Sequence, residues 1–316
     1  MNRIIFLLMA VVAMMAAACN SESNSGKNTD EDKEKVSVTH AQGTTEVPVN
    51  PQRVVVLDFA SLENLDLIDA KVVGLTKLAV PAYLKKYEED ESIVNVGSLV
   101  EVNLEKINEL QPDLILAGGR LSESYNALSR IAPTIITNFD LDNPLGALKK
   151  DLDNLGKIFG RQDVYDQAYS DLQEKISSVK KEGDLSDEKA LVVLHNQGRF
   201  SAYGSGSRFG LIHDVLGLEE ASAGLDTHLH GTRASSEFIK ETNPDILFIV
   251  DRSAAIGDQP LNREEVENEL IRRTNAYKNG KIIYLNSDAW YLSGTGGIQS
   301  VNIMVDEVAQ VFGSGS

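Results

Sequence analysis

The chain has 316 residues, of which 47 are acidic and 30 are lysine or arginine, so its formal net charge at pH 7 is −17. Such an excess of negative charge is unsuited to nucleic acid or to an anionic lipid surface, because both partners are bound through basic side chains. A single cysteine excludes an internal disulfide and a cysteine-rich metal site. The length is sufficient for two domains with apolar cores of their own.

The first 18 residues predict a signal peptide. Arg3 is followed by an apolar run, residues 4–18, that is too short to span a bilayer comfortably. Three alanines then precede Cys19, an order that resembles the lipobox of bacterial lipoproteins, in which the cysteine becomes the lipidated N-terminus, although Ala16 stands where leucine is usual. A plain signal peptide is the alternative. We favour lipidation because the chain has no other cysteine.

The segment that follows Cys19 predicts a flexible tether. Residues 20–35 contain no apolar side chain, so they cannot bury enough surface to offset the entropy lost on ordering. We assign residues 19–45 to this tether. The folded part is therefore expected on the extracytoplasmic face of the cell membrane, attached by the lipid on Cys19.

Short apolar runs alternate with amphipathic stretches in the rest of the chain. The runs rich in β-branched residues are 53–58, 71–76, 113–119, 190–195, 245–251 and 281–285. This alternation predicts an α/β fold with two α/β lobes, residues 46–146 and 184–316, and a ligand cleft between them. The connecting residues 147–183 are apolar at helical spacing, and we expect a long rigid helix over residues 164–182 to join the lobes.

Two segments of the chain match each other without gaps. Residues 102–120 read VNLEKINELQPDLILAGGR, and residues 234–252 read ASSEFIKETNPDILFIVDR. Each predicts a helix, a Pro-Asp turn, a strand and an arginine at the carboxyl end of the strand. Because ligands of open α/β sheets bind beyond the carboxyl ends of strands, we expect Arg120 and Arg252 to face one cleft from opposite lobes.

Six segments, taken in order, resemble the helical-backbone substrate-binding proteins of ABC importers for iron siderophores and cobalamin. They are VVVLDFASLENL, LQPDLILAGGR, SAYGSGSRFGLIHDVLG, HGTRASSEF, NPDILFIVDR and IIYLNSDAWYLSGTGG. The similarity covers roughly residues 46–312 and is closest to the catecholate siderophore binders of the enterobactin and petrobactin type. It implies a monomeric receptor that is not an enzyme, has no intrinsic cofactor, and delivers a ferric siderophore to the permease of an importer.

The resemblance also implies roles for individual residues. The ligand-binding arginines of the family fall on Arg120, Arg208 and Arg252. The side chains that complete the iron coordination sphere fall on His230 and Tyr291, with His228 as the alternative histidine because His230 lies in an HLH triplet. The glutamates that dock the lobes onto the permease fall on Glu105 and Glu237, for which stabilisation of a helix N-terminus is the alternative role.

The chemistry of these residues agrees with a ferric catecholate ligand. A ferric tris-catecholate carries about three negative charges on phenolate oxygens and aromatic rings, and arginine stays charged, bonds to oxygen pairs and stacks on rings. Haem, cobalamin and hydroxamate siderophores carry less negative charge and are the alternatives within the fold. A metal-dependent hydrolase using His228, His230 and Asp226 is the alternative of another class, but the sequence offers it no supported nucleophile or general base.

Overall fold

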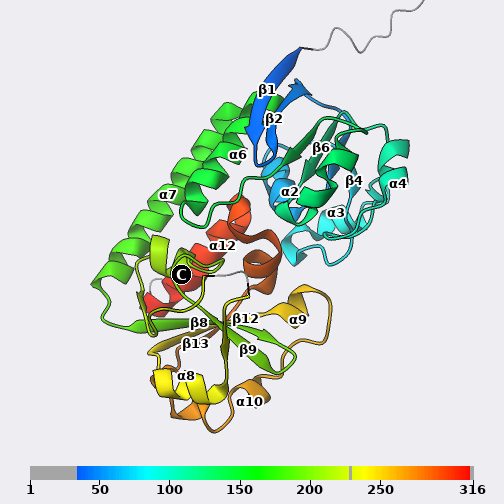
Figure 1. Cartoon of the computed structure of the whole chain (residues 1–316). Coiled ribbons are helices and arrows are strands. Elements are labelled where there is room, and N and C mark those ends of the chain that lie inside the picture. Colours follow the sequence, from blue (N-terminus) through cyan, green and yellow to red (C-terminus); the bar gives the residue numbers. More distant parts are fainter. Residues whose placement is uncertain (1–33, 228–229, 314–316) are drawn as a thin grey trace, which may run out of the picture. The chain divides into compact units, whose positions relative to one another are not determined.

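The computed structural model describes residues 34–227 and 230–313, and its folded unit begins at Lys35 (Figure 1). Two β-sheets with flanking helices form two lobes, which confirms the predicted α/β class. Among the described residues, no helix combines the length and the apolar character that crossing a membrane requires. The predicted signal peptide, the lipidation site Cys19 and His228 lie outside the described residues.

A β-hairpin opens the folded unit, and it corrects the predicted end of the tether. Strands β1 (Lys35–His40) and β2 (Gly43–Pro48) pair antiparallel, with Lys35 opposite Pro48. Val38 and Val47 are buried in the core. The sequence predicts a tether up to residue 45, but the side chains of β1 alternate between solvent and more buried positions, as in a strand with one face on the core.

The sheet of the N-terminal lobe is parallel throughout. Its five strands are β3 (Val54–Val56), β4 (Val72–Leu75), β5 (Val94–Asn95), β6 (Leu114–Ala117) and β7 (Thr134–Ile136). They lie in the order β5-β4-β3-β6-β7. The order reverses between β3 and β6, and the carboxyl ends of the strands at such a switch point form the usual ligand crevice of open α/β sheets. Arg120 follows β6 at this position.

The sheet of the C-terminal lobe is mixed. Its strands are β8 (Lys189–Asn196), β9 (Arg199–Tyr203), β10 (Glu219–Glu220), β11 (Thr232–Ala234), β12 (Ile246–Asp251) and β13 (Ile282–Leu285). The main path runs β11-β9-β8-β12-β13, and β10 pairs with the start of β8. Strands β8, β12 and β13 are parallel, whereas β9 runs antiparallel to β8 and β11. All six predicted apolar runs coincide with strands.

Helices cover the sheets and connect the lobes. They are α2 (Phe59–Asp66), α3 (Lys85–Glu89), α4 (Leu104–Glu109), α5 (Tyr125–Leu128), α6 (Pro144–Phe159), α7 (Gln162–Leu185), α8 (Ser236–Thr242), α9 (Arg252–Ala255), α10 (Arg263–Val266), α11 (Asn275–Lys278) and α12 (Ile298–Ala309). The long helix expected over residues 164–182 is α7, which has 24 residues and lies beside α6 (Figure 1). It leads from the N-terminal lobe into β8.

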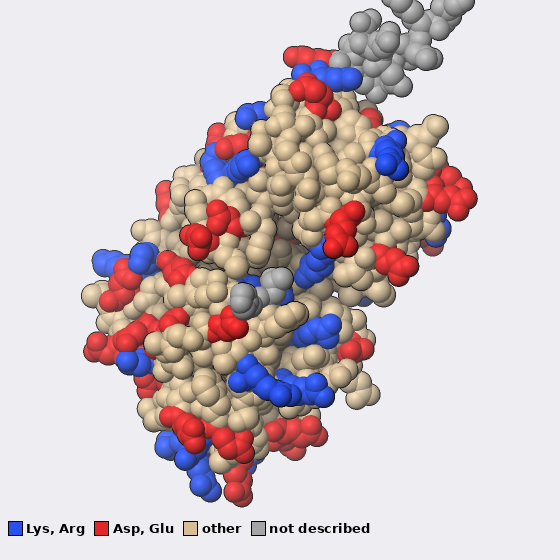
Figure 2. All heavy atoms as spheres, in the orientation of Figure 1, with Lys and Arg blue, Asp and Glu red and all other residues tan. Residues whose placement is uncertain are grey.

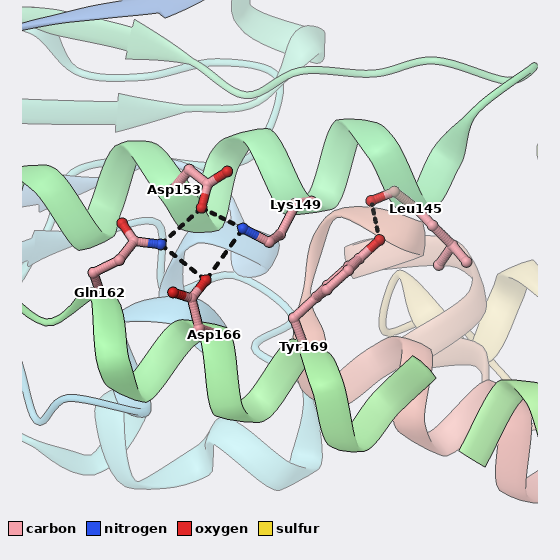
Figure 3. Close-up of polar contacts among 6 residues, drawn as sticks. All are labelled: Leu145, Lys149, Asp153, Gln162, Asp166 and Tyr169. Atoms are coloured by element: carbon pink, nitrogen blue, oxygen red, sulfur yellow. Dashed lines mark hydrogen bonds and ion pairs between the residues drawn. The ribbon is translucent and has the colours of Figure 1, made fainter. Parts of the chain in front are cut away.

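Polar contacts fix α6 against α7 (Figure 3). The Lys149 ammonium lies 2.5 Å from an Asp153 carboxylate oxygen and 3.2 Å from one of Asp166. Gln162 donates to the same two carboxylates at 2.7 and 3.0 Å, and the Tyr169 hydroxyl donates to the Leu145 carbonyl oxygen at 3.2 Å. Since partly exposed ion pairs contribute at most about 1 kcal/mol each, these contacts mainly set the register of the two helices.

One apolar core passes through both lobes. Val54 of β3, Leu172 of α7, Val192 of β8 and Val305 of α12 belong to a single buried cluster. Two smaller clusters cover the other face of each sheet. Because separating the lobes would expose the shared cluster at about 25 cal/mol per Å² of apolar surface, this core holds the two lobes together.

The internal sequence match corresponds to a repeated structural unit. Helix α4 leads to β6 and helix α8 leads to β12 through the same Pro-Asp turn. The Asp113 carboxylate accepts from the Arg53 backbone amide at 2.8 Å, and the Asp245 carboxylate accepts from that of Lys189 at 3.1 Å. In each lobe the repeated aspartate therefore fixes the start of the neighbouring strand, so that both strands deliver their terminal arginine from an equivalent position.

A buried carboxylate joins the N-terminal lobe to the C-terminal segment. Glu63 of α2 is 1% exposed and accepts from the Tyr83 hydroxyl at 2.7 Å and the Ser300 backbone amide at 2.8 Å. The neighbouring Asn64 accepts from the Ile298 amide at 3.0 Å. Burial raises the pKa of Glu63 to about 7, although its hydrogen bonds oppose the shift. This carboxyl therefore titrates near neutral pH at a junction between the lobes.

The raised pKa of Glu63 makes the stability of the protein depend on pH. The folded state holds the proton more tightly than the unfolded chain, so the favourable contribution is complete below pH 4.5 and is lost as pH rises through about 7. Glu63→Gln keeps an acceptor for Ser300 and lets the Tyr83 hydroxyl turn to accept. We expect the free energy of unfolding in urea to fall less between pH 5 and pH 8 in this variant, by on the order of 1 to 3 kcal/mol.

Glu91→Gln removes an exposed carboxylate of the same lobe and serves as the matched control. It should retain the wild-type dependence on pH. An identical fall in the wild type and in Glu63→Gln would contradict the assignment.

Candidate functional site

Tyr291 lies in a tightly held segment between β13 and α12. Residues Asp288–Ser293 form a short π-helical turn, and Gly294 follows it with a φ of 64°. The neighbouring Trp290 is buried and donates its indole N–H to Glu307 at 2.8 Å. From the other lobe, the Ala82 amide donates to the Asp288 carboxylate at 2.9 Å. The backbone around Tyr291 is therefore anchored on both sides.

Arg120 reaches this segment from the N-terminal lobe. It lies in the turn directly after β6, and its side chain is exposed. Its Nη2 donates to the Tyr291 carbonyl oxygen at 3.0 Å, and its Nη1 donates to that of Leu292 at 3.3 Å. These bonds hold the guanidinium at the junction of the lobes rather than in a solvated loop.

Arg208 approaches the same carbonyl from the C-terminal lobe. Its Nη2 donates to the Tyr291 oxygen at 3.1 Å, and its guanidinium carbon lies 4.6 Å from the centre of the Tyr291 ring. The Phe209 ring lies 5.0 Å away from it. Burial is the main cause that lowers the pKa of Arg208 from its usual value, and the nearby Arg120 charge lowers it further. The group nevertheless remains a cation at neutral pH, because arginine starts above 12.

Arg252 completes the cluster. It is the first residue of α9, directly after β12, and its Nε donates to the Tyr291 hydroxyl at 2.8 Å. Its Nη1 donates to the side-chain oxygen of Asn196, at the end of β8, at 3.3 Å. Asn196 thus orients Arg252, which lies 5.7 Å from the centre of the Tyr291 ring.

The structure therefore brings together four of the residues singled out in the sequence. We call Arg120, Arg208 and Arg252 the arginine triad. Two of its members share one acceptor oxygen, so their Nη2 atoms are at most about 6 Å apart, where two unit charges repel by about 3 kcal/mol at an effective dielectric constant of 20. Among the described residues, no carboxylate forms an ion pair with any of the three. The site consequently favours an anion.

The surface carries charges of both signs close to a hollow. Figure 2 shows this hollow near the middle of the face it draws, with blue lysine and arginine atoms and red aspartate and glutamate atoms near it. The chain as a whole is strongly acidic, but charges beyond about 8 Å are largely screened at physiological ionic strength. Nearby charges, such as the arginine triad, therefore matter more for binding than the net charge does.

Among the described residues, no hydrogen bond joins His230 to the arginine triad. It lies exposed in a turn before β11. The adjacent Gly231 has a φ of 62°, and a Cβ at this position would lie 2.6 Å from the Ala202 carbonyl oxygen and 2.8 Å from the Tyr203 ring. Only glycine fits this close approach. The turn is thus packed against Tyr203, a residue that interacts electrostatically with Arg208 and Tyr291.

Glu105 and Glu237 lie apart from the triad, on α4 and α8 of different lobes (Figure 1). Both are exposed in the first turn of their helix. The helices are capped by Asn103, which accepts from the Lys106 amide, and by Ser235, which accepts from that of Phe238. A hydrogen bond from Ser235 is the main cause that lowers the pKa of Glu237. The two carboxylates occupy equivalent positions in the repeated unit.

Three residues of the site were not identified from the sequence. Asn196 accepts a hydrogen bond from Arg252, and Tyr203 interacts electrostatically with Arg208. The third residue is the buried Asp58. Burial raises the pKa of Asp58, and the positive charge of the nearby Arg120 opposes this rise. Asp58 is the N-cap of α2 directly after β3. The position of Asp58, at the end of a predicted strand beside the switch point, is the signal that could have identified it.

The described residues hold no metal-binding cluster. Within residues 34–227 and 230–313, no group of three or more histidine, cysteine, aspartate or glutamate side chains could hold a metal ion. The hydrolase alternative uses His228, His230 and Asp226, of which His228 lies outside the described residues. His230 and Asp226 form no such group with other described residues.

The model of one protein family, described as periplasmic binding protein, matches residues 54–289. The chain belongs to this family. The periplasmic binding proteins are binding proteins and not enzymes, as the sequence predicts. The match covers both sheets and the arginine triad, and it ends two residues before Tyr291.

Characterised members of the periplasmic binding protein family are similar over almost the whole chain. The petrobactin-binding protein YclQ of Bacillus subtilis is 42% identical over 98% of both chains, and its crystal structure has a TM-score of 0.85 over 88% of this chain and 98% of that one. The structure of the siderophore-binding protein BauB, bound to two molecules of acinetobactin and ferric iron, is 41% identical in sequence and has a TM-score of 0.82. The match covers 88% of this chain and 98% of BauB. VctP of Vibrio cholerae, a periplasmic catecholate-siderophore binding protein, is 32% identical and has a TM-score of 0.83. The match covers 88% of this chain and 100% of VctP.

Proposed function

We propose that this protein captures a ferric catecholate siderophore with its arginine triad and delivers it to an ABC importer. The observation that carries this proposal is the convergence of three guanidinium groups, from both lobes, on the single residue Tyr291. Among the described residues no carboxylate forms an ion pair with the three arginines, and only the buried Asp58 acts on Arg120 through its charge, so most of their mutual repulsion remains until an anion binds. A ligand with about three negative charges removes this repulsion and gains charge-assisted hydrogen bonds.

The aromatic character of the site supports a catecholate over other anions. The guanidinium carbon of Arg208 lies 4.6 Å from the centre of the Tyr291 ring and 5.0 Å from that of Phe209, so aromatic rings already line the cationic site. Catecholate rings can stack on arginine while their phenolate oxygens accept its hydrogens. The proteins YclQ, BauB and VctP bind petrobactin, acinetobactin with ferric iron, and a catecholate siderophore, respectively. Haem, cobalamin and hydroxamate siderophores carry less charge and would leave part of the repulsion in place.

Tyr291 and His230 are proposed to bind the iron directly when the siderophore leaves coordination positions open. Ferric iron prefers oxygen donors and accepts imidazole. The Tyr291 oxygen already receives a hydrogen bond from Arg252, a contact that would also stabilise the phenolate form bound to iron. Glycine at position 231 gives the turn that carries His230 a fixed position beside Tyr203. A siderophore with four donor atoms leaves two positions for these side chains, whereas one with six leaves none.

Titration of ferric chelates separates these roles. Arg120→Gln, Arg208→Gln and Arg252→Gln should each weaken binding of a ferric tris-catecholate by at least about 1.5 kcal/mol, because each loses a charge-assisted hydrogen bond. His230→Ala should weaken binding of a ferric chelate with four catecholate donors and leave the tris-catecholate unaffected. Quenching of Trp290, the only tryptophan and the neighbour of Tyr291, provides the measurement.

Arg130→Gln is the matched control. It removes one positive charge, as each triad variant does, but at an exposed position outside the triad, and it should bind the ferric tris-catecholate as the wild type does. Unchanged affinity in all three triad variants would reject the catecholate assignment. An equal effect of His230→Ala on both chelates would reject its role as an iron ligand.

Glu105 and Glu237 are proposed to dock the two lobes onto the permease. Their matched positions, exposure and separate lobes suit a transporter with two similar halves. The double variant Glu105→Gln/Glu237→Gln should retain siderophore affinity and lose most stimulation of the importer ATPase in proteoliposomes. Glu109→Gln/Glu241→Gln is the matched control, because these exposed glutamates occupy the other equivalent pair on the same helices. Equal ATPase stimulation by both double variants would contradict the docking role.

We further propose that Cys19 is lipidated and anchors the protein on the extracytoplasmic face of the membrane. The three alanines before Cys19 and the polar residues after it support this proposal. Cys19→Ser should move the protein from the membrane fraction to the soluble fraction and abolish incorporation of labelled palmitate. Retention of the variant and of the label in the membrane would show that another segment anchors the chain.

A further inference from the structure

Two exposed arginines outside the triad lie on the last two strands at one side of the C-terminal sheet, β9 and the edge strand β11. Arg199 begins β9 and Arg233 lies in the middle of β11. The two strands pair antiparallel with Arg233 opposite Ser201, so Arg233 lies diagonally across from Arg199 on the neighbouring strand. Both side chains are exposed. We call Arg199 and Arg233 the edge pair.

The edge pair projects from the same face of the sheet as Tyr203. Side chains alternate along a strand, and Phe200, Ala202 and Ala234 all pack into the cluster on the opposite face. Tyr203 instead belongs to the core shared by the two lobes. Arg199 and Arg233 therefore lie on the face of the sheet that Tyr203 shares with the candidate site.

Strand register places Arg199 near the triad. Asn196, the last residue of β8, lies directly opposite Arg199 of β9 and binds Arg252 on its other side. Adjacent strands are about 4.8 Å apart, so the backbones of Arg199 and Arg252 are roughly 10 Å apart with Asn196 between them. At this spacing of the backbones, one ligand bound by Arg252 can also extend to Arg199.

Within the described part of the chain, neither guanidinium of the edge pair has a partner of opposite charge. Among the described residues, no hydrogen bond or ion pair joins the side chain of Arg199 or Arg233 to another group. In a chain with 17 more acidic than basic residues, two adjacent arginines without a carboxylate are available to an external anion. The triad is directed at Tyr291, so the edge pair offers a separate contact.

We propose that the edge pair forms a second anion subsite, which binds a carboxylate carried by the siderophore outside the iron coordination sphere. This inference rests on the proposed function and narrows it. The triad would recognise the charge of the iron centre, and the edge pair would select chelates whose backbone or side arm carries a further negative charge. A carboxylate can bridge the two guanidiniums, because each offers parallel N–H donors to carboxylate oxygens.

A matched pair of ligands tests the subsite. One probe is a ferric tris-catecholate with a carboxylate on its backbone, so that six catecholate oxygens leave no iron position for the carboxylate, and the other is the same chelate with the carboxylate converted to a methylamide. The wild type should bind the carboxylate probe at least about fivefold more tightly than the amide. The Arg199→Gln/Arg233→Gln variant should bind both probes equally, with an affinity for the amide that matches the wild type.

Arg130→Gln/Arg273→Gln removes two exposed positive charges elsewhere and should retain the wild-type preference. A wild type that binds both probes equally well, or an edge-pair variant that keeps the preference, would overturn the inference and leave the proposed function intact. Absence of binding to either probe in the wild type would reject both.

Discussion

The account depends on the gathering of three positive charges around one tyrosine. The Tyr291 carbonyl accepts from Arg120 and Arg208, and its hydroxyl accepts from Arg252. Neutral acceptors orient the guanidiniums without cancelling their charge. A carboxylate at the same place would have neutralised the site and removed its preference for anions. Because their acceptors are a backbone oxygen and a phenol, the three arginines keep the positive charge that attracts an anion.

The rest of the fold positions the three arginines. Arg120 follows β6 and Arg252 follows β12, two strands whose starts are fixed by the equivalent aspartates Asp113 and Asp245. Glu63 ties the segment after Tyr291 to the N-terminal lobe. The shared apolar core then keeps the lobes at a distance where an arginine of one can reach a carbonyl of the other. Binding needs little rearrangement when the cations are already in place.

Much of this arrangement could be predicted from the sequence, for identifiable reasons. The apolar runs predict the strands because a strand buried on both faces needs continuous apolar residues. The internal repeat predicts Arg120 and Arg252 as equivalent, because the same helix-turn-strand unit places both. Arg208 has no such repeat, and only the resemblance to a known family identified it. The predicted tether extends too far, to residue 45, because the short strand β1 directly follows a charged segment and contains few apolar residues.

The other contacts of the site depend on the local backbone conformation and on strand register, which cannot be read from the sequence pattern. The Tyr291 carbonyl becomes the shared acceptor only because residues 288–293 form a π-helical turn. Asn196 meets Arg252 only because β8 and β12 end in register. No local pattern specifies either contact. A prediction from sequence can therefore name the cations of this site and Tyr291, but not the contacts of its carbonyl oxygen and of Asn196 that orient the cations.

The most direct test compares ligands of equal shape and unequal charge. Tris-catecholate complexes of ferric iron and of tetravalent titanium share six oxygen donors, and the titanium complex carries one negative charge fewer. If neutralisation of the arginine triad drives binding, the ferric complex should bind at least about tenfold more tightly at low ionic strength, and the difference should shrink as salt is added. Equal affinity for the two complexes, or tighter binding of titanium, would contradict the account.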